Sequence, residues 1–265
     1  MPALPEVLTR YFVQNFDAYA AAARQLIDYD RRYTVQDTRD LTRYRDFTWA
    51  SGNPIENAGV HYAHAAGLTG AGQSIAISDT GFLTTHETLA GRDITLGTNP
   101  GVDGHGTQVA SVAAGNSASM VGVAPGASLI LGSFGSLEPL TEVAVLARRH
   151  GSVALNNSWT FVGLTASASD YSYVFDNTAG QAYAAAVSDY VAGGGVAVWA
   201  APNDQSATDV GLMAALPVLR PDLEPGWIAV VNGLPTLSDD DVVSATLRSA
   251  GCMEAAEWCV AADGT

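Results

Sequence analysis

Lysine is absent from this chain of 265 residues, and all twelve basic residues are arginine. The chain has 27 acidic residues, so its formal net charge is −15. Because a nucleic-acid backbone attracts positive charge, we expect no nucleic-acid partner. Acidic surfaces are more typical of solubility or salt tolerance than of a specific ligand. No apolar run reaches the roughly 18 residues of a membrane-spanning helix, so we also expect no membrane span.

The first residues lack the pattern of a secretory signal peptide. The segment Met1–Glu6 has no basic region followed by a continuous apolar stretch. Three explanations remain open: a signal was removed, the gene begins elsewhere, or the protein stays inside the cell.

Cysteine is scarce, since Cys252 and Cys259 are the only two and have six residues between them. Two thiols without a nearby histidine make a poor zinc site, so we assign no metal to them. The spacing leaves a local disulfide and a pair of reduced core thiols as alternatives. A disulfide would place the protein in an oxidising compartment.

Charge is unevenly distributed along the chain. Seven of the twelve arginines lie between Arg10 and Arg45, among several aspartates, and this stretch ends near Gly52-Asn53-Pro54. Such a turn-forming sequence is typical of a boundary. We therefore predict an N-terminal mixed-charge extension over residues 1–52 and a globular domain over residues 53–265.

Beyond about Gly67, short β-rich runs alternate with longer helical stretches, which predicts an α/β fold with a parallel sheet. The runs are apolar, as in strands that are buried on both faces, so we expect helices on both faces of the sheet. The predicted strands are 74–78, 128–132, 153–158, 196–200 and 227–231, the predicted helices are 107–114, 140–150 and 179–191, and 163–177 is a predicted loop.

Polar clusters stand at the carboxyl ends of three of these strands, where active groups gather in open parallel sheets: one closes the third strand and the others follow the first and the fourth. They are Asp79-Thr80-Gly81, Asn156-Asn157-Ser158 and Asn203-Asp204. Taken alone, Asp79-Thr80-Gly81 also fits a turn at the end of a strand. It would suit half of an aspartic peptidase as well, but that class is β-rich and the chain has no second such triplet.

The segment Gly104-His105-Gly106-Thr107 is more specific, because it places a histidine between two glycines at the start of a predicted helix. The flanking glycines give the imidazole ring little steric cover. A plain turn at the start of a helix is the alternative.

Together, Asp79 and His105 resemble the pattern of the subtilisin-like serine peptidases. That family has Asp-Thr-Gly after a sheet strand and His-Gly-Thr-x-Val-Ala at a helix start. Other matches follow in the expected order: Gly70-Ala71-Gly72, Gly122–Ala127 and Asn157-Ser158-Trp159. The resemblance covers roughly residues 58–265 and comes nearest to bacterial secreted and autotransporter subtilases. It implies a subtilisin-like sheet and the hydrolysis of peptide bonds in protein or peptide substrates.

The resemblance also implies a role for particular residues. His105 would be the general base and Asp79 would fix its tautomer. Asn203 would donate to the oxyanion, although Pro202 stands where the family usually has glycine. An ordinary turn asparagine is the alternative for Asn203.

Ser158-Trp159-Thr160 would form the strand that pairs with an extended substrate. Thr160 departs from the glycine that is common in the family, which leaves the substrate preference open. The alternative for Trp159 is a buried aromatic residue.

The family's nucleophile lies in a Gly-Thr-Ser-x-Ala motif, and the 265 residues contain no such motif. Ser111, Ser158 and Ser249 stand in other contexts. We therefore expect a C-terminally incomplete sheet, a chain that is inactive alone, and a downstream segment that carries the serine. The alternatives are an inactive truncated or split fragment and a non-catalytic peptide-binding module.

Two further expectations follow from the resemblance alone. Secreted relatives carry a similar cysteine-flanked segment, which implies a Cys252–Cys259 bond and a secreted or cell-surface location. Family members often bind structural calcium, but the sequence has no compact Asp-rich loop to which calcium can be assigned.

Overall fold

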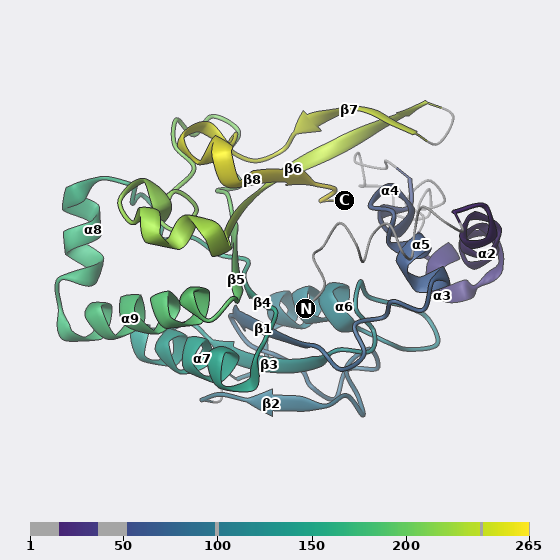
Figure 1. Cartoon of the computed structure of the whole chain (residues 1–265), viewed down its shortest axis with the longest axis horizontal. Helices are drawn as coiled ribbons and strands as arrows, with labels where there is room; N and C mark the ends of the chain where they lie inside the picture. Colours follow the sequence, from purple (N-terminus) through teal and green to yellow (C-terminus); the bar gives the residue numbers. More distant parts are fainter. Residues whose placement is uncertain (1–15, 37–51, 99–100, 239–240, 265) are drawn as a thin grey trace.

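The computed structural model describes residues 16–36, 52–98, 101–238 and 241–264 (Figure 1). In this part of the chain an eight-stranded sheet has the order β2-β3-β1-β4-β5-β6-β7, and β8 also pairs with β6. Every pairing between these strands is parallel except β6 with β7. The strands are β1 (Ser74–Asp79), β2 (Ile94–Leu96), β3 (Ser128–Ser133), β4 (Ala154–Asn157), β5 (Val196–Ala200), β6 (Trp227–Ser238), β7 (Asp241–Leu247) and β8 (Cys259–Ala262). The predicted α/β class is confirmed.

Helices cover both faces of the sheet. The helices are α2 (Phe16–Tyr29), α3 (Arg31–Thr34), α4 (Pro54–Asn57), α5 (Val60–Ala65), α6 (Gly104–Ala114), α7 (Leu137–His150), α8 (Ala168–Phe175) and α9 (Thr178–Ala192), with short 3-10 helices η3 (Leu216–Val218), η4 (Pro221–Gly226) and η5 (Met253–Trp258). Successive side chains of a strand point to opposite faces. On β1, Ala76 therefore packs in the core with α7 and α9, whereas Ile77 packs in a second core with α6.

All five predicted strands and all three predicted helices are present, with shifted ends. The predicted loop 163–177 is wrong, because it contains α8. This helix begins after Ser167, whose side chain accepts a hydrogen bond from the backbone of Asp170. Val174 and Phe175 are buried in the main core, so tertiary packing outweighs the serine- and alanine-rich composition.

The third predicted strand also ends earlier than expected. Pairing of β4 with β5 stops at the pair Asn157 and Trp199, so the residues from Ser158 onward lie outside the strand. The side-chain amide of Asn156 donates to Ser158 Oγ at 2.9 Å across the end of the strand. The expected extended strand at 158–160 is therefore a loop that continues from the edge of the sheet.

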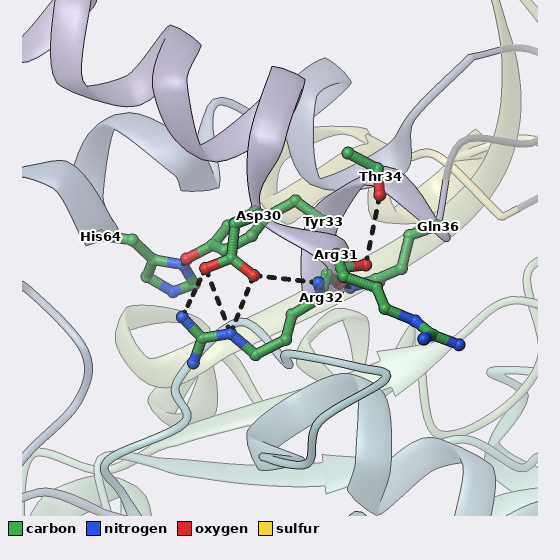
Figure 2. Close-up of polar contacts among 7 residues, drawn as sticks. All are labelled: Asp30, Arg31, Arg32, Tyr33, Thr34, Gln36 and His64. Atoms are coloured by element: carbon green, nitrogen blue, oxygen red, sulfur yellow. Dashed lines mark hydrogen bonds and ion pairs between the residues drawn. The ribbon is translucent and has the colours of Figure 1, made fainter.

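The described part of the predicted N-terminal extension, residues 16–36, packs against α5. Ile27, Tyr33, Ile55 and Val121 form a small core of their own. The Tyr33 hydroxyl and the Nδ1 atom of His64 are 2.9 Å apart (Figure 2). His64 Nε2 lies 2.9 Å from the carbonyl oxygen of Val123. Because a carbonyl can only accept, Nε2 carries the proton and Nδ1 accepts from Tyr33. The remainder of the extension lies outside the described residues, and its boundary at residue 52 stays a prediction.

No helix in the described ranges combines the length and the apolar character that crossing a bilayer requires.

Candidate active site

Asp79 and His105 meet where the last residue of β1 faces the first turn of α6. The Nδ1 atom of His105 lies 2.7 Å from Asp79 Oδ1, which confirms the contact predicted from the two motifs. The Asp79 side chain is completely buried, whereas that of His105 is 54% exposed. An ionised carboxylate can only accept, so it selects the imidazole tautomer with hydrogen on Nδ1. In that tautomer Nε2 has a lone pair that can take a proton.

Two glycines allow β1 and α6 to approach so closely. A Cβ atom on Gly106 would lie 2.2 Å from the carbonyl oxygen of Gly81 and 3.0 Å from Asp79 Cβ. A Cβ atom on Gly81 would lie 2.9 Å from the carbonyl oxygen of Gly101. Gly106 is therefore required by the close approach of β1 and α6. It also leaves the imidazole ring of His105 uncovered.

Asp103 is a residue of this site that the sequence analysis missed. It is the N-cap of α6, and its Oδ1 atom accepts from the His105 backbone N–H at 2.8 Å. The same oxygen accepts from the Thr80 hydroxyl at 2.7 Å. The Thr80 hydroxyl first and the His105 N–H second hold the pKa of Asp103 below its ordinary value. An aspartate just before a helix start is a known capping signal, and it could have identified Asp103.

The other predicted site residues follow the neighbouring strands of the sheet. Ser158-Trp159-Thr160 comes after β4 and Asn203 comes after β5. Since β1, β4 and β5 are parallel neighbours, their carboxyl ends share one edge of the sheet with Asp79. The loops after β4 and β5 are close together, because a Cβ on Gly211 would lie 2.9 Å from Thr160 Oγ1 and 3.6 Å from Cγ of Pro202. The Asn203 side chain is exposed to solvent.

Trp159 is a partly buried aromatic residue, and its role in substrate binding stays a prediction. Its ring centroid lies 5.2–5.3 Å from those of Phe134, Phe161 and Trp199, so it belongs to an aromatic cluster. It also lines a pocket of about 290 Å³, together with Phe134, Leu140, Thr160 and Val162. The indole Nε1 is buried and has no hydrogen-bond partner in the described part of the chain. Aromatic walls of this kind suit an apolar side chain.

The cysteines lie beside β8. The sulfur atoms of Cys252 and Cys259 are bonded, and their Cα atoms are 5.8 Å apart, within the expected range. Among the residues that the structure describes, no three His, Cys, Asp or Glu side chains are grouped so that they could hold a metal ion. We therefore assign no residues to calcium.

Comparisons with known proteins agree with this geometry. The model of the subtilase family matches residues 70–265. Among solved structures, the prenylagaramide maturation protease PagA has a TM-score of 0.54 at 20% identity, and the match covers 72% of this chain and 62% of that chain. The self-cleaved protease domain of PatA also has a TM-score of 0.54, at 22% identity, with coverage of 74% and 69%. At these identities the likeness concerns the fold. No curated protein matches the sequence.

Proposed function

Because the chain belongs to the subtilase family, we propose that it is a serine endopeptidase of the subtilisin type, which hydrolyses peptide bonds in protein or peptide substrates. The observation that carries this proposal is the 2.7 Å contact between His105 Nδ1 and the buried carboxylate of Asp79. A histidine held in this way is a general base for a serine hydroxyl. PagA and PatA, which share the fold, are both described as proteases.

In the proposed mechanism His105 takes the proton from the attacking serine at Nε2 and later gives it to the leaving amine. Asp79 keeps the hydrogen on Nδ1 and stabilises the imidazolium that forms. Asn203 donates a hydrogen bond to the oxyanion of the tetrahedral intermediate, and loss of such a donor costs on the order of 3 kcal/mol.

In this proposal the serine is supplied by a segment outside these 265 residues, because the printed sequence contains no Gly-Thr-Ser-x-Ala motif. A groove of about 770 Å³ beside α6 offers room for such a segment. Val112 of α6, Val121 and Val123 line it, together with Ala261 and Ala262 of β8. The valines Val112 and Val123 are 57% and 47% exposed, which is high for apolar side chains. A segment packed there would lie against Val112, near the C-terminal end of α6.

Substrate binding is assigned to the loop Ser158-Trp159-Thr160, where an extended peptide would pair with the backbone. The aromatic pocket beside Trp159 would receive an apolar side chain of the substrate. A secreted or cell-surface location is part of the proposal and is supported by the Cys252–Cys259 bond, since disulfides persist in oxidising compartments. Structural calcium stays a prediction from the family.

The test compares the 265-residue chain with the same chain extended by its natural downstream sequence. Both are assayed with a chromogenic peptide and with a serine-directed fluorophosphonate probe, and His105→Ala in the extended chain is the control. We expect the short chain to be silent, with turnover lower by a factor of about 10⁶ because the nucleophile is missing. The extended chain should cleave the peptide and be labelled on one serine, and His105→Ala should abolish both.

Two outcomes would contradict the proposal. Robust cleavage by the short chain, with stoichiometric labelling of one serine, would show that the nucleophile lies within residues 1–265. An extended chain that binds peptides without cleaving them would favour the non-catalytic peptide-binding module.

A further inference from the structure

Four residues at the candidate active site form a closed ring of polar contacts, of which the proposed mechanism uses only the contact between Asp79 and His105. His105 Nδ1 lies 2.7 Å from Asp79 Oδ1, and the His105 backbone N–H donates to Asp103 Oδ1 at 2.8 Å. Thr80 closes the ring, because its hydroxyl oxygen lies 2.7 Å from Asp103 Oδ1 and 3.1 Å from Asp79 Oδ1. The ring joins the end of β1 to the start of α6 through side chains of both elements.

Thr80 has one hydroxyl proton and two carboxylates within reach. The shorter contact is to Asp103, whose side chain is exposed and whose pKa is held below its ordinary value by the Thr80 hydroxyl and the His105 N–H. Asp103 is therefore ionised at neutral pH and attracts the proton. The backbone N–H of Thr80 donates to Asp79 Oδ1 at 2.7 Å. Thr80 thus holds both carboxylates at the same time.

Asp79 depends on these contacts for its orientation. The N–H donors to its carboxylate, which are the Thr80 backbone and the His105 ring, both meet Oδ1, and the Thr80 hydroxyl oxygen lies 3.1 Å from the same atom. Its Oδ2 atom is buried without a partner among the described residues. The carboxylate is therefore held from one side, by the backbone N–H of Thr80 and by His105, while the hydroxyl of Thr80 is fixed by Asp103.

We propose that Asp103, acting through Thr80, is a positioning residue that holds the Asp79 carboxylate against His105 and so selects the Nδ1–H tautomer. The inference rests on the proposed function, because that tautomer leaves Nε2 free to accept the serine proton. A capping role alone explains the bond from the His105 backbone to Asp103. It does not explain the second bond, from the hydroxyl of Thr80.

The test separates positioning from capping through Thr80→Val in the 265-residue chain. This substitution removes the hydroxyl but keeps the shape of the side chain, the backbone N–H and the Asp103 cap. Thr80→Ser restores a hydroxyl. The matched control is Thr165→Val, because the Thr165 hydroxyl and backbone N–H both donate to Asp170 Oδ2 at 2.9 Å, near the start of α8. Urea unfolding is measured on all variants.

The main measurement is the tautomer of His105 from ¹⁵N NMR of the imidazole nitrogens, with Asp79→Asn as the reference for a lost carboxylate. We expect the wild-type chain to hold hydrogen on Nδ1. Thr80→Val should shift the ratio of Nδ1–H to Nε2–H by a factor of about five or more, as expected for the loss of a hydrogen bond to a charged group. Thr80→Ser should keep the wild-type ratio. Thr165→Val should lose about as much stability as Thr80→Val, but it should leave the tautomer ratio of His105 at the wild-type value.

A Thr80→Val variant with the wild-type ratio would overturn the positioning role and leave the proposed function standing. A wild-type chain with hydrogen on Nε2, unaffected by Asp79→Asn, would overturn the proposed function and the positioning role together. If Thr80→Val does not fold, Thr80→Ala replaces it, since alanine also lacks the hydroxyl but keeps the backbone N–H and the Asp103 cap. A shift in the same direction supports the proposal, and an unchanged ratio contradicts it.

Discussion

Alanine in place of Gly106 should disrupt the candidate active site, whereas alanine in place of Gly104 should not. The two glycines flank His105 in the same turn of α6. A Cβ on Gly106 would lie 2.2 Å from the Gly81 carbonyl oxygen, and a Cβ on Gly104 has nothing within 4 Å. Since 3.4 Å is an ordinary contact, β1 and α6 must separate by roughly 1 Å in Gly106→Ala, and overpacking of this kind costs about 1–3 kcal/mol. Alanine otherwise favours a helix over glycine by up to about 1 kcal/mol, so Gly104→Ala should be neutral or stabilising.

The assay has a stability part and an activity part. Urea unfolding of the 265-residue variants should show a loss only for Gly106→Ala. In the chain extended by its downstream sequence, a shift of about 1 Å at His105 should lower kcat/KM on the order of 10²-fold. Equal stability and equal activity of the two variants would refute the reasoning, because it would show that β1 and α6 do not approach as closely as described.

Two further predictions concern stability. Burial holds the pKa of His64 below its ordinary value of 6.5. As the pH falls, the unfolded chain therefore takes up a proton at His64 before the folded chain does. The free energy of unfolding is therefore highest above pH 6.5 and decreases below it. The free energy of unfolding is measured by urea unfolding between pH 7.5 and 5, which is roughly the range over which histidine changes from neutral to charged. His64→Gln should lower the slope of this free energy against pH by at most about 1.4 kcal/mol per pH unit. An unchanged slope would show that His64 titrates normally in the folded protein. Replacing both Cys252 and Cys259 by serine should cost about 2–3 kcal/mol, since the bond closes a short loop. Identical urea midpoints for the serine variant and the oxidised protein would contradict this.

The local chemistry of the candidate site was readable from the sequence. A histidine between two glycines at a helix start, and Asp-Thr-Gly after a short apolar strand, are local patterns whose spacing and order can be seen without coordinates. The five strands and three helices were also predictable, because burial on both faces leaves continuous apolar runs. The contact of Asp79 with His105 followed from these two motifs together.

Other features depended on packing between distant segments. The segment 163–177 reads as a loop because its serines and alanines carry little periodicity, yet Val174 and Phe175 are buried and make part of it a helix. The early end of β4 is set by its pairing with β5, and no local pattern marks it.

By itself, the sequence determined the fold class, which rests on the alternation of short apolar runs with helical stretches, and the motifs of Asp79 and His105, each of which is a short run of neighbouring residues. Only the tertiary structure decided that Thr80 and Asp103 bond to each other across the site. They are 23 positions apart and belong to two elements, so their contact exists only when β1 and α6 pack together. The same packing explains why Gly106 cannot carry a side chain.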